Sequence, residues 1–353
     1  MNKDLKTNES SCPSCGATMR YSPTRQKLFC ENCETCKDIA FEKLAAKHAW
    51  EDREKIQKNN DWAQDVNNLK CPNCGASVIL HKLEYSKACP YCGSSLVGDM
   101  EKYNTFMPDG IMPFKFSNEE AAERYVKGIR KKHFVPNAFK KAPPTENIKG
   151  IYIPVFGFDA NTHSTYKGTL ATDTTHTDSK GRSHTTTSYQ YIKGEKDVNF
   201  TDILVETSSK LNQIQLQQIE PYNTGEIVKF NQGFIMGYTV EQFETNLENC
   251  KKISENIMKE SIKKQILAKY HYDRVVSFEM NTNYSAEKFG YYLMPTYKCD
   301  YEYKNKHYTT FMNGQTGKVG GGYPKSPLKI TLFVLFILLL IGGVIALFMA
   351  LTK

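Results

Sequence analysis

The sequence predicts a multidomain α+β protein with two four-cysteine zinc ribbons and one C-terminal transmembrane helix. Paired cysteines repeat within the first hundred residues, strand-type and helix-type hydrophobic periods alternate through the middle, and an uncharged apolar segment ends the chain. The expected domains are zinc ribbon 1 (1–37), a helical connector (38–69), zinc ribbon 2 (70–98), an α+β domain with antiparallel sheet and possible internal duplication (99–325), and the transmembrane helix (330–351).

The chain is long enough for two or more soluble domains before the apolar segment, and its positive charge is unevenly distributed. The 353 residues include 12% aromatic side chains, a content that argues against a disordered chain. Residues 1–100 carry 14 Lys and Arg against 13 Asp and Glu, whereas the remaining 253 residues carry 32 against 25. The excess positive charge therefore lies in the part of the chain next to the apolar segment.

Residues 12–33 and 71–92 form an internal repeat, CPSCGATMRYSPTRQKLFCENC and CPNCGASVILHKLEYSKACPYC. Each copy holds two Cys-x-x-Cys pairs separated by 14 residues. Zinc binds four soft ligands in a tetrahedron, and each pair supplies two of them from one tight turn. With no export signal in view we expect a reducing compartment, where such pairs bind metal rather than form disulfides. The expected ligands of two structural Zn²⁺ ions are Cys12, Cys15, Cys30 and Cys33, and Cys71, Cys74, Cys89 and Cys92.

The first ribbon leaves its ligand set open. Cys33 and Cys36 also form a Cys-x-x-Cys pair, so Cys36 is an alternative to Cys30. The matched 14-residue gap favours Cys30 with Cys33 and leaves Cys36 as a spare thiol or an exchange ligand. Glycine follows the second cysteine in three of the four pairs, where a turn can need positive φ, but it does not follow Cys33.

The connector over residues 38–69 is rich in Ala, Glu and Lys. Apolar residues recur at helical spacing on both sides of Asn59 and Asn60, which predicts two helical pieces with a break between them. His48 is expected to be a core or half-buried histidine rather than a ligand. The residues that define the pattern are Phe41, Leu44, Ala45 and His48, followed by Trp62, Val66 and Leu69.

The first half of the α+β region predicts a strand, a capped helix and a second strand. Residues 111–116 have a strand pattern, and Ser117 with Glu120 matches a capping box that opens a helix. Residues 151–160 form an apolar strand interrupted by Pro154, which predicts a place at a sheet edge or a bulge.

The second half predicts a helix followed by a hairpin. Thr239 with Gln242 matches a helix cap, and the apolar stripe that follows includes Cys250 as a packing residue. Residues 291–312 predict a hairpin that turns near residues 304–306, with a further turn at Asn313-Gly314.

The two halves resemble one another in sequence. MPFKFSNEEA (112–121) is similar to MGYTVEQF (236–243), and IPVFGFDA (153–160) is similar to MPTYKCDY (294–301). We therefore predict a duplicated strand–helix–strands unit.

Residues 171–189, ATDTTHTDSKGRSHTTTSY, are nearly symmetrical about Ser179-Lys180-Gly181 and predict a long exposed hairpin. His176 and His184 would lie opposite one another. A metal site that joins them to His163, Asp173 and Asp178 is an alternative, but no recognised ligand spacing supports it.

No motif for an enzyme is present. Gly314 to Lys318, GQTGK, resembles a phosphate loop only in part, because the glycine spacing is too short and no hydroxyl residue follows the lysine. We therefore expect a turn there and no enzyme activity.

Nucleic-acid binding is the alternative function for the ribbons. Eight thiolates and two zinc ions add about −4 to residues 1–100, which makes this module slightly acidic and a poor general binder of phosphates. Arg20, Arg25 and Lys27 remain as a small candidate basic patch. We expect nucleic acid not to be a partner.

The terminal segment, ITLFVLFILLLIGGVIALFMAL (330–351), would form a helix of about 33 Å against a hydrocarbon core of about 30 Å. Lys325 and Lys329 precede it, which fits the positive-inside bias. Since the first residues are polar, we expect a single-pass protein of the cell membrane, anchored by its tail in the lipid bilayer with its N-terminal domains in the cytoplasm. Gly342-x-x-x-Ala346 permits helix packing in a homo-oligomer.

The motifs together resemble a bacterial family, the zinc-ribbon membrane proteins of YdjG type, whose ribbons are of the TFIIB type. The resemblance is carried by the CPxCGA ribbons and by the segments IYIPVFGFDA, YLMPTYKCDYEYKNK and FMNGQTGKVGGGYPKSP before the terminal helix. It implies a membrane-bound adaptor in an envelope-stress system, encoded beside a PspA (phage-shock) protein. The implied partners are cytosolic SPFH or zinc-ribbon-like proteins and PspA-like proteins.

Overall fold

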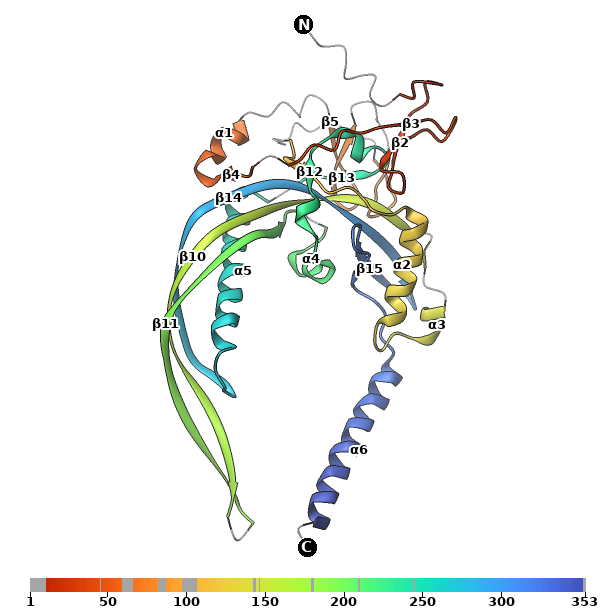
Figure 1. Cartoon of the computed structure of the whole chain (residues 1–353). Coiled ribbons are helices and arrows are strands. Elements are labelled where there is room, and N and C mark those ends of the chain that lie inside the picture. Colours follow the sequence, from red (N-terminus) through yellow and green to blue (C-terminus); the bar gives the residue numbers. More distant parts are fainter. Residues whose placement is uncertain are drawn as a thin grey trace.

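The protein consists of two cysteine-rich ribbons, an α+β body with a long curved sheet, and a separate apolar helix (Figure 1). The ribbons lie at one end of the body, and the helix α6 (Pro327–Leu351) leaves the other end. This arrangement agrees with the predicted fold class. The computed structural model describes residues 11–44, 46–58, 66–81, 87–96, 107–141, 144–145, 147–178, 181–208, 210–243 and 245–351.

Two antiparallel strands of 30 residues each, β10 (Ile148–Thr177) and β14 (Arg274–Tyr303), form the centre of the body. Strand β11 (Ser183–Glu206) pairs with β10, and β15 (Lys306–Asn313) pairs with β14. These long strands curve into an arch (Figure 1). The predicted hairpins at residues 171–189 and 291–312 are both confirmed, and the second turns at Lys304 and Asn305, which have positive φ.

The pairing of the short strands indicates a duplicated unit. The first unit runs β9 (Gly110–Ile111), α2 (Asn118–Lys131), β10 and β11, and the second runs β13 (Thr239–Glu241), α5 (Leu247–Leu267), β14 and β15. Strand β9 pairs in parallel with β14 of the second unit, and β13 pairs in parallel with β10 of the first. The first strand of each unit therefore pairs with the long strand of the other unit.

The prolines of the two units occupy equivalent places. Pro154 was predicted at an edge or bulge, but β10 lies at the centre of the sheet, with Pro154 opposite Leu293 of β14. On its other side β13 pairing stops at Tyr152 and β11 pairing starts at Val155, so the proline lies in a gap where no ladder needs its missing N–H. Pro295 lies in the corresponding gap between β9, paired at Leu293, and β15, paired from residue 296.

The helix predictions hold with changes at the ends. The Ser117 hydroxyl accepts from the Glu120 N–H and Glu120 accepts from the Ser117 N–H, so the predicted capping box opens α2. The predicted cap at Thr239 is wrong, because that residue lies in β13 and Asn246 caps α5 instead. The predicted strand over residues 111–116 is only the two-residue β9. A short helix, α3 (Asn137–Lys141), was not predicted.

The predicted helical connector is wrong over most of its described length. Residues 39–44 contain no helix, β4 (His48–Ala49) pairs with β14, and only η1 (Trp50–Asp52) and α1 (Arg53–Lys58) are helical. The segment predicted as the second helix ends as β5 (Val66–Lys70); the expected break at Asn59-Asn60 and Trp62 lie outside the described residues. Contacts with the body override the helical pattern, since Ile39 packs on Gly233 and the Phe41 ring contacts Phe234.

Strand β4 is held on the arch by charged side chains. Lys47 forms ion pairs with Asp159 and Asp202, and all three are mostly buried. His48 Nε2 lies 2.6 Å from Asp109 Oδ1. This hydrogen bond raises the pKa of His48 above its ordinary value, although partial burial opposes the shift. His48 is half-buried, as predicted, and it links the connector to the body.

The raised pKa of His48 predicts a pH-dependent contact. A group whose pKa is raised by folding stabilises the folded state below its unfolded-state value of about 6.5, and the contribution is lost as pH rises through the folded-state pKa. We expect amides of residues 47–49 to exchange with deuterium faster at pH 8.5 than at pH 6, after correction for intrinsic rates. The pH effect should disappear in His48→Gln; equal protection of the natural chain at both pH values would contradict the prediction.

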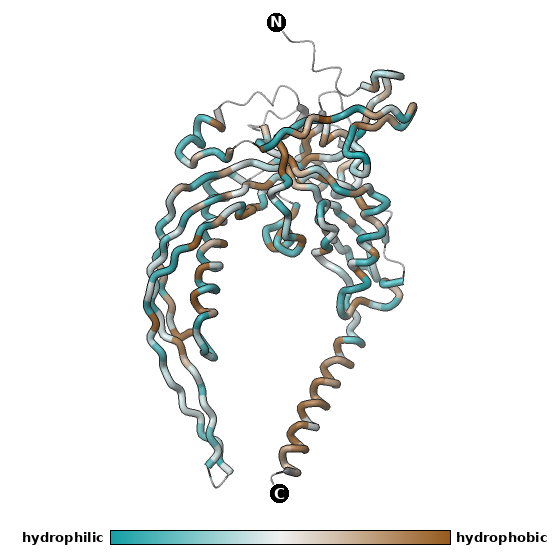
Figure 2. The backbone as a smooth tube through the Cα atoms, viewed as in Figure 1, coloured by the Kyte–Doolittle hydropathy of each residue, from teal (hydrophilic) through white to brown (hydrophobic). Residues whose placement is uncertain are grey.

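The distal arch consists of residues 161–178, 181–199 and 274–285. It is a three-stranded sheet as far as Ala171 of β10, with α5 on its inner side (Figure 1). Ile262, Ile266 and Leu267 of α5 pack against Tyr166, Leu170 and Ile192, and each such apolar side chain contributes roughly 1.5–3 kcal/mol on burial. The arch and α6 extend from the body in the same direction (Figure 1). Helix α6 is apolar all round (Figure 2).

Smaller elements complete the body. Asn313 Oδ1 accepts from the N–H groups of Gln315 and Thr316, which forms the predicted turn after β15. The remaining elements of the body are α4 (Gln213–Ile219), η3 (Thr224–Glu226), β12 (Val228–Lys229), η4 (Gln232–Ile235) and β16 (Val319–Gly321).

Candidate metal centres

The eight cysteines predicted as ligands form two clusters. In each cluster the four sulfur atoms lie within 4.8 Å of one another. The distances between Sγ atoms are 3.4 Å for Cys12 and Cys33 and 3.5 Å for Cys15 and Cys30. In the second cluster they are 3.5 Å for Cys71 and Cys92 and 3.7 Å for Cys74 and Cys89. Zn–S bonds of about 2.3 Å give a regular tetrahedron an edge of about 3.8 Å, so both clusters have dimensions that suit a metal ion.

Each cluster is built from two turns with the same backbone hydrogen bonds. In the turn at Cys12 the Gly16 N–H donates to the Cys12 carbonyl and the Cys12 N–H donates to the Ala17 carbonyl. The turns that begin at Cys30, Cys71 and Cys89 repeat both bonds. The repeated geometry explains the shared Cys-x-x-Cys spacing, because it directs both sulfur atoms of a pair to one point.

The turn without glycine adopts the same conformation as the other three. Gly16, Gly75 and Gly93 have φ values of 75°, 70° and 75°, and Glu34 in the equivalent position has φ of 60°. A non-glycine residue in this region is uncommon, and the two backbone hydrogen bonds of the turn hold it there. Cys30 and Cys33 are therefore the pair that joins the first cluster.

Cys36 lies outside the cluster. It is exposed on β3 (Cys36–Lys37), and its sulfur accepts a hydrogen bond of 3.5 Å from Arg25. The strand pairs with β2 (Lys27–Phe29), which pairs in turn with β1 (Arg20–Ser22). The structure thus leaves Cys36 as a surface thiol.

The protonation of the free thiols differs within each cluster. Burial raises the pKa of Cys12, but backbone N–H groups of Cys15 and Ser14 outweigh it and bring the pKa to about 6. In the second cluster burial raises the pKa of Cys89 well above its ordinary value, whereas hydrogen bonds from Ser94 bring the pKa of Cys92 to about 6 despite burial. A coordinated divalent ion deprotonates its thiol ligands and would remove these differences.

Both ribbons are packed on the body. The Tyr21 hydroxyl and Gln26 amide donate to the Phe114 carbonyl at 3.3 and 3.0 Å. Strand β6 (Ser77–His81) of the second ribbon pairs with β13, and Lys298 lies over the Tyr91 ring at 4.1 Å. Strands β7 (Lys87–Ala88) and β8 (Ser95–Leu96) complete the second ribbon. The clusters are consequently held in fixed positions relative to the arch.

The candidate basic patch of the first ribbon is largely neutralised. Arg20 pairs with Glu31 at 3.4 Å, and Lys27 pairs with Asp38 at 2.8 Å. Arg25 lies over the Phe29 ring at 4.1 Å. Two of the three cations are thus occupied by carboxylates, which weakens the case for a phosphate-binding surface.

The histidines of the hairpin do not gather into one site. His176 and His184 lie opposite one another as predicted, but His163 is far along β10, where its Nδ1 is 2.6 Å from Asp197. The Asp173 carboxylate binds Arg274 at 2.5 Å and accepts from Thr187. Among the described residues, only the two cysteine clusters bring together three or more candidate ligands.

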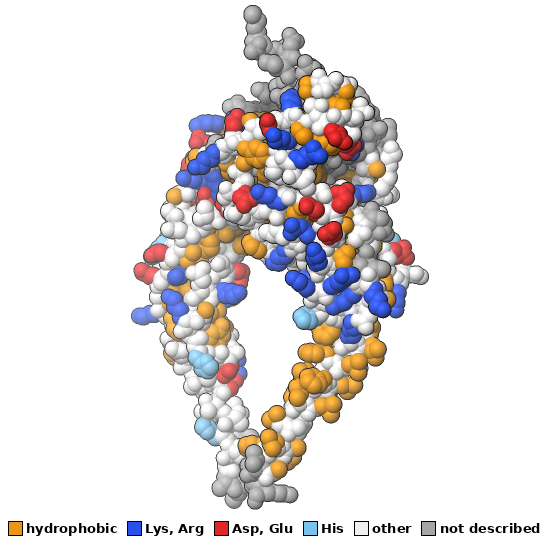
Figure 3. Space-filling model, turned by 45° about the vertical axis from the view of Figure 1, so that its right-hand side comes forward, with side chains coloured by type: hydrophobic (Ala, Val, Ile, Leu, Met, Phe, Trp, Pro, Cys, Tyr) orange, Lys and Arg blue, Asp and Glu red, His pale blue; other side chains and the backbone are white. Residues whose placement is uncertain are grey.

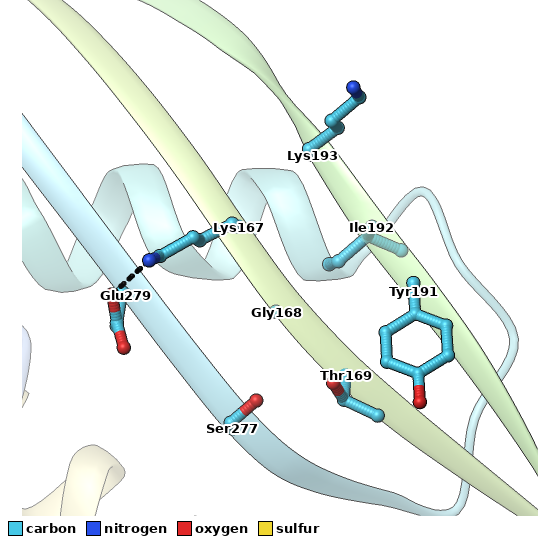
Figure 4. Close-up of a pocket in the computed structure, with 8 residues that line it drawn as sticks. All are labelled: Lys167, Gly168, Thr169, Tyr191, Ile192, Lys193, Ser277 and Glu279. Carbon is cyan, nitrogen blue, oxygen red and sulfur yellow. Dashed lines mark ion pairs between the residues drawn. The ribbon is translucent and has the colours of Figure 1, made fainter.

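Two features that resemble small-molecule sites have structural explanations. Lys318 of the GQTGK segment donates to the Glu220 carbonyl, and the segment is a turn between β15 and β16. A shallow open depression lies over Gly168 on the arch, where Lys167 and Glu279 form an ion pair at 2.9 Å (Figure 4). Its side chains do not converge on a common point, so it has no catalytic arrangement.

The helix α6 is long and apolar enough to cross a membrane. Residues 327–350 have a mean hydropathy of 3.1 over their most apolar window, and none of that window is buried. A soluble core helix would bury much of such a surface.

The chain is a distant homologue of a Bacillus subtilis (strain 168) protein, the uncharacterized protein YdjG. The two are 24% identical over 331 residues, which cover 90% of this chain and 91% of the relative. No protein-family model matches the chain. No solved structure matches it either.

Proposed function

We propose that this protein is a tail-anchored, non-enzymatic zinc scaffold that holds cytosolic partner proteins at the cell membrane. One observation carries the proposal: two four-cysteine clusters and an apolar helix lie at opposite ends of one continuous body (Figure 1). Such a chain can present rigid modules at a fixed place beside a bilayer. The proposed topology puts the ribbons and the body in the cytoplasm.

The proposed ion in each cluster is Zn²⁺ in a structural role. Four thiolates per cluster complete a tetrahedral shell and leave no position for a substrate or a reactive water. The second ribbon is small, with a core that consists mostly of its own cysteines, Leu69, Ala76 and Val78. Metal binding would supply the folding energy that so small a core lacks.

The outer part of the arch suits a protein partner. Tyr191 and Tyr189 are 83% and 58% exposed, and tyrosine is enriched in protein interfaces. Within the described part of the chain no strand pairs with the outer edge of β11 or of β14 in the distal arch, so a partner strand can add to either edge. The partner classes implied by the family resemblance, SPFH or zinc-ribbon-like and PspA-like proteins, are those we propose to test first.

Crosslinked pull-down from membranes, read by mass spectrometry, tests the scaffold. We expect a cytosolic protein to be captured with the full chain and to leave the membrane fraction when residues 327–353 are deleted. If that protein stays on the membrane, the recruiting role is wrong. Capture of DNA or RNA, released by nuclease and by salt, would instead support a membrane-tethered nucleic-acid-binding regulator.

A pair of variants locates the partner surface. Tyr189→Ala with Tyr191→Ala should reduce capture by about tenfold or more, since exposed aromatic anchors carry much of an interface's energy. Ile214→Ala is the matched control, because Ile214 is 67% exposed on α4, away from the distal arch. Equal capture by both variants would remove the arch from the proposed interface.

A further inference from the structure

The chain around the base of α6 has a one-sided charge. Between Glu123 and Glu146 the sequence has seven Lys and Arg residues and no acidic residue. From Lys304 to Lys353 it has six lysines and again no acidic residue. Two segments far apart in the sequence are thus basic without interruption.

The fold brings these two segments together. The Ser326 N–H donates to the Phe134 carbonyl at 2.6 Å, and Lys329 Nζ donates to the Val135 carbonyl at 2.7 Å. One turn further into α6, the Phe333 ring contacts Phe134 with centroids 5.4 Å apart. Lys and Arg side chains gather above the apolar α6 (Figure 3). We call this set the basic collar: Lys127, Arg130, Lys131, Lys132, Lys140, Lys141, Lys325 and Lys329.

The basic collar is not neutralised by the protein. No described carboxylate forms an ion pair with any of its members, whereas cations of the distal arch such as Lys167, Arg182 and Arg274 each have an acidic partner. Burial and the nearby Lys318 ammonium lower the pKa of Lys132. Favourable contact with the C-terminal helix dipole accounts for Arg130 and Lys131 at the end of α2. It does not account for the remaining six.

We propose that the basic collar binds anionic phospholipid headgroups of the leaflet that α6 enters. The collar lies beside the start of α6, where Ser326 and Lys329 contact residues 134–137, so its ammonium and guanidinium groups would lie near headgroup level once α6 is inserted. The Phe134 ring would lie at the boundary with the acyl chains, where aromatic side chains are favoured. The inference rests on the proposed membrane anchoring but not on the recruitment of partners.

Lysine footprinting of the full chain in lipid nanodiscs tests this inference. Acetylation rates are compared between discs of phosphatidylcholine and discs that also contain phosphatidylglycerol. We expect Lys131, Lys141 and Lys325 to react about fivefold more slowly in anionic discs, equivalent to about 1 kcal/mol for a cation near such a surface. The exposed Lys193 of the arch and Lys252 of α5 should react at equal rates in both. High salt should remove the protection.

A charge-matched pair of variants supplies a second readout. R130Q/K131Q/K141Q/K325Q and the control K193Q/K252Q/K264Q/K269Q each remove four exposed cations. Only the collar variant should lose its preference for phosphatidylglycerol among co-purified lipids. Should the collar variant fail to fold, footprinting of the natural chain decides the question alone.

The outcomes separate this inference from its premise. A chain that does not insert into either disc contradicts the membrane anchor. A chain that inserts but shows equal lysine reactivity in both discs overturns the collar's role. Protection of the control lysines to the same degree as the collar overturns it as well, because the effect is then a general one of surface charge.

Discussion

Replacing Cys71 by Ser should lower the metal content of the chain from two zinc ions to one and unfold the second ribbon. Cys71 is almost completely buried, and its sulfur lies 3.5 Å from that of Cys92. Structural zinc in small modules contributes about 10–16 kcal/mol of binding free energy, far more than the few apolar contacts of this ribbon. Metal analysis of the purified protein measures the loss of zinc. Limited proteolysis should show new cleavage between residues 71 and 92, which reports the unfolding of the second ribbon.

The surface thiol Cys36 provides the control for this experiment. Because it lies outside both clusters, Cys36→Ser should keep both ions and the stability of the natural chain. Loss of an ion from this variant would mean that Cys36 exchanges with Cys30 as a ligand. A natural chain that is folded without any metal would contradict the assignment of both clusters.

The second large effect should come from Asn313, a fully buried side chain at the end of β15. Its amide donates to the carbonyls of Ile219 and Pro221 at 3.0 and 3.2 Å, and its oxygen accepts two backbone N–H groups of the following turn. Asn313→Ala would leave these four backbone groups without their partner. Since each buried unpaired group costs about 1–3 kcal/mol, we expect a loss of about 3 kcal/mol or more in the free energy of unfolding.

Thermal or urea unfolding of the chain in detergent measures this loss. The control is Asn199→Ala, because Asn199 is exposed on β11 and an isolated surface substitution changes stability by about 0.5 kcal/mol or less. A stability change of Asn313→Ala as small as that of the control would show that water replaces the lost hydrogen bonds. The turn would then not anchor α4 to the sheet.

Sequence patterns predicted the elements whose cause is local. The capping box at Ser117 requires only two residues three positions apart, and it opens α2 as predicted. The Lys304-Asn305 turn depends on the conformation of its own residues. The Cys-x-x-Cys turns are the clearest case, because spacing alone directs both sulfur atoms to one point.

The failures share a different cause, which is pairing with distant strands. Residues 38–49 have a helical pattern, but the docking of Lys47 and His48 on the arch holds them extended. Pro154 was excluded from a central strand by a sound local rule, and only the gap between β13 and β11 makes it acceptable there. The length of the arch was likewise not evident, since its distal strands are too polar to stand out.

Spatial clusters were also beyond the reach of sequence patterns. The basic collar is formed by two segments about two hundred positions apart, which only the fold shows to be neighbours. One signal was available in retrospect: each segment lacks acidic residues. The ion pairs of Arg20 with Glu31 and of Lys27 with Asp38 had no such signal, because a cation and a carboxylate eleven residues apart in the sequence match no recognised pairing pattern.

The parallel course of the arch and α6 has a consequence for the shape of the protein in a membrane. The distal arch is polar and has open strand edges, and hydrocarbon offers no partner for exposed backbone groups. The distal arch therefore cannot lie in the bilayer beside a membrane-spanning α6, although both extend from the body in the same direction (Figure 1). In the proposed anchored state α6 and the arch must therefore diverge, and the change in direction must leave the contacts of Ser326 and Lys329 with Phe134 and Val135 intact, because these contacts hold the basic collar at the base of the helix. The arch would then lie above the lipid surface, to one side of the point where α6 enters the bilayer.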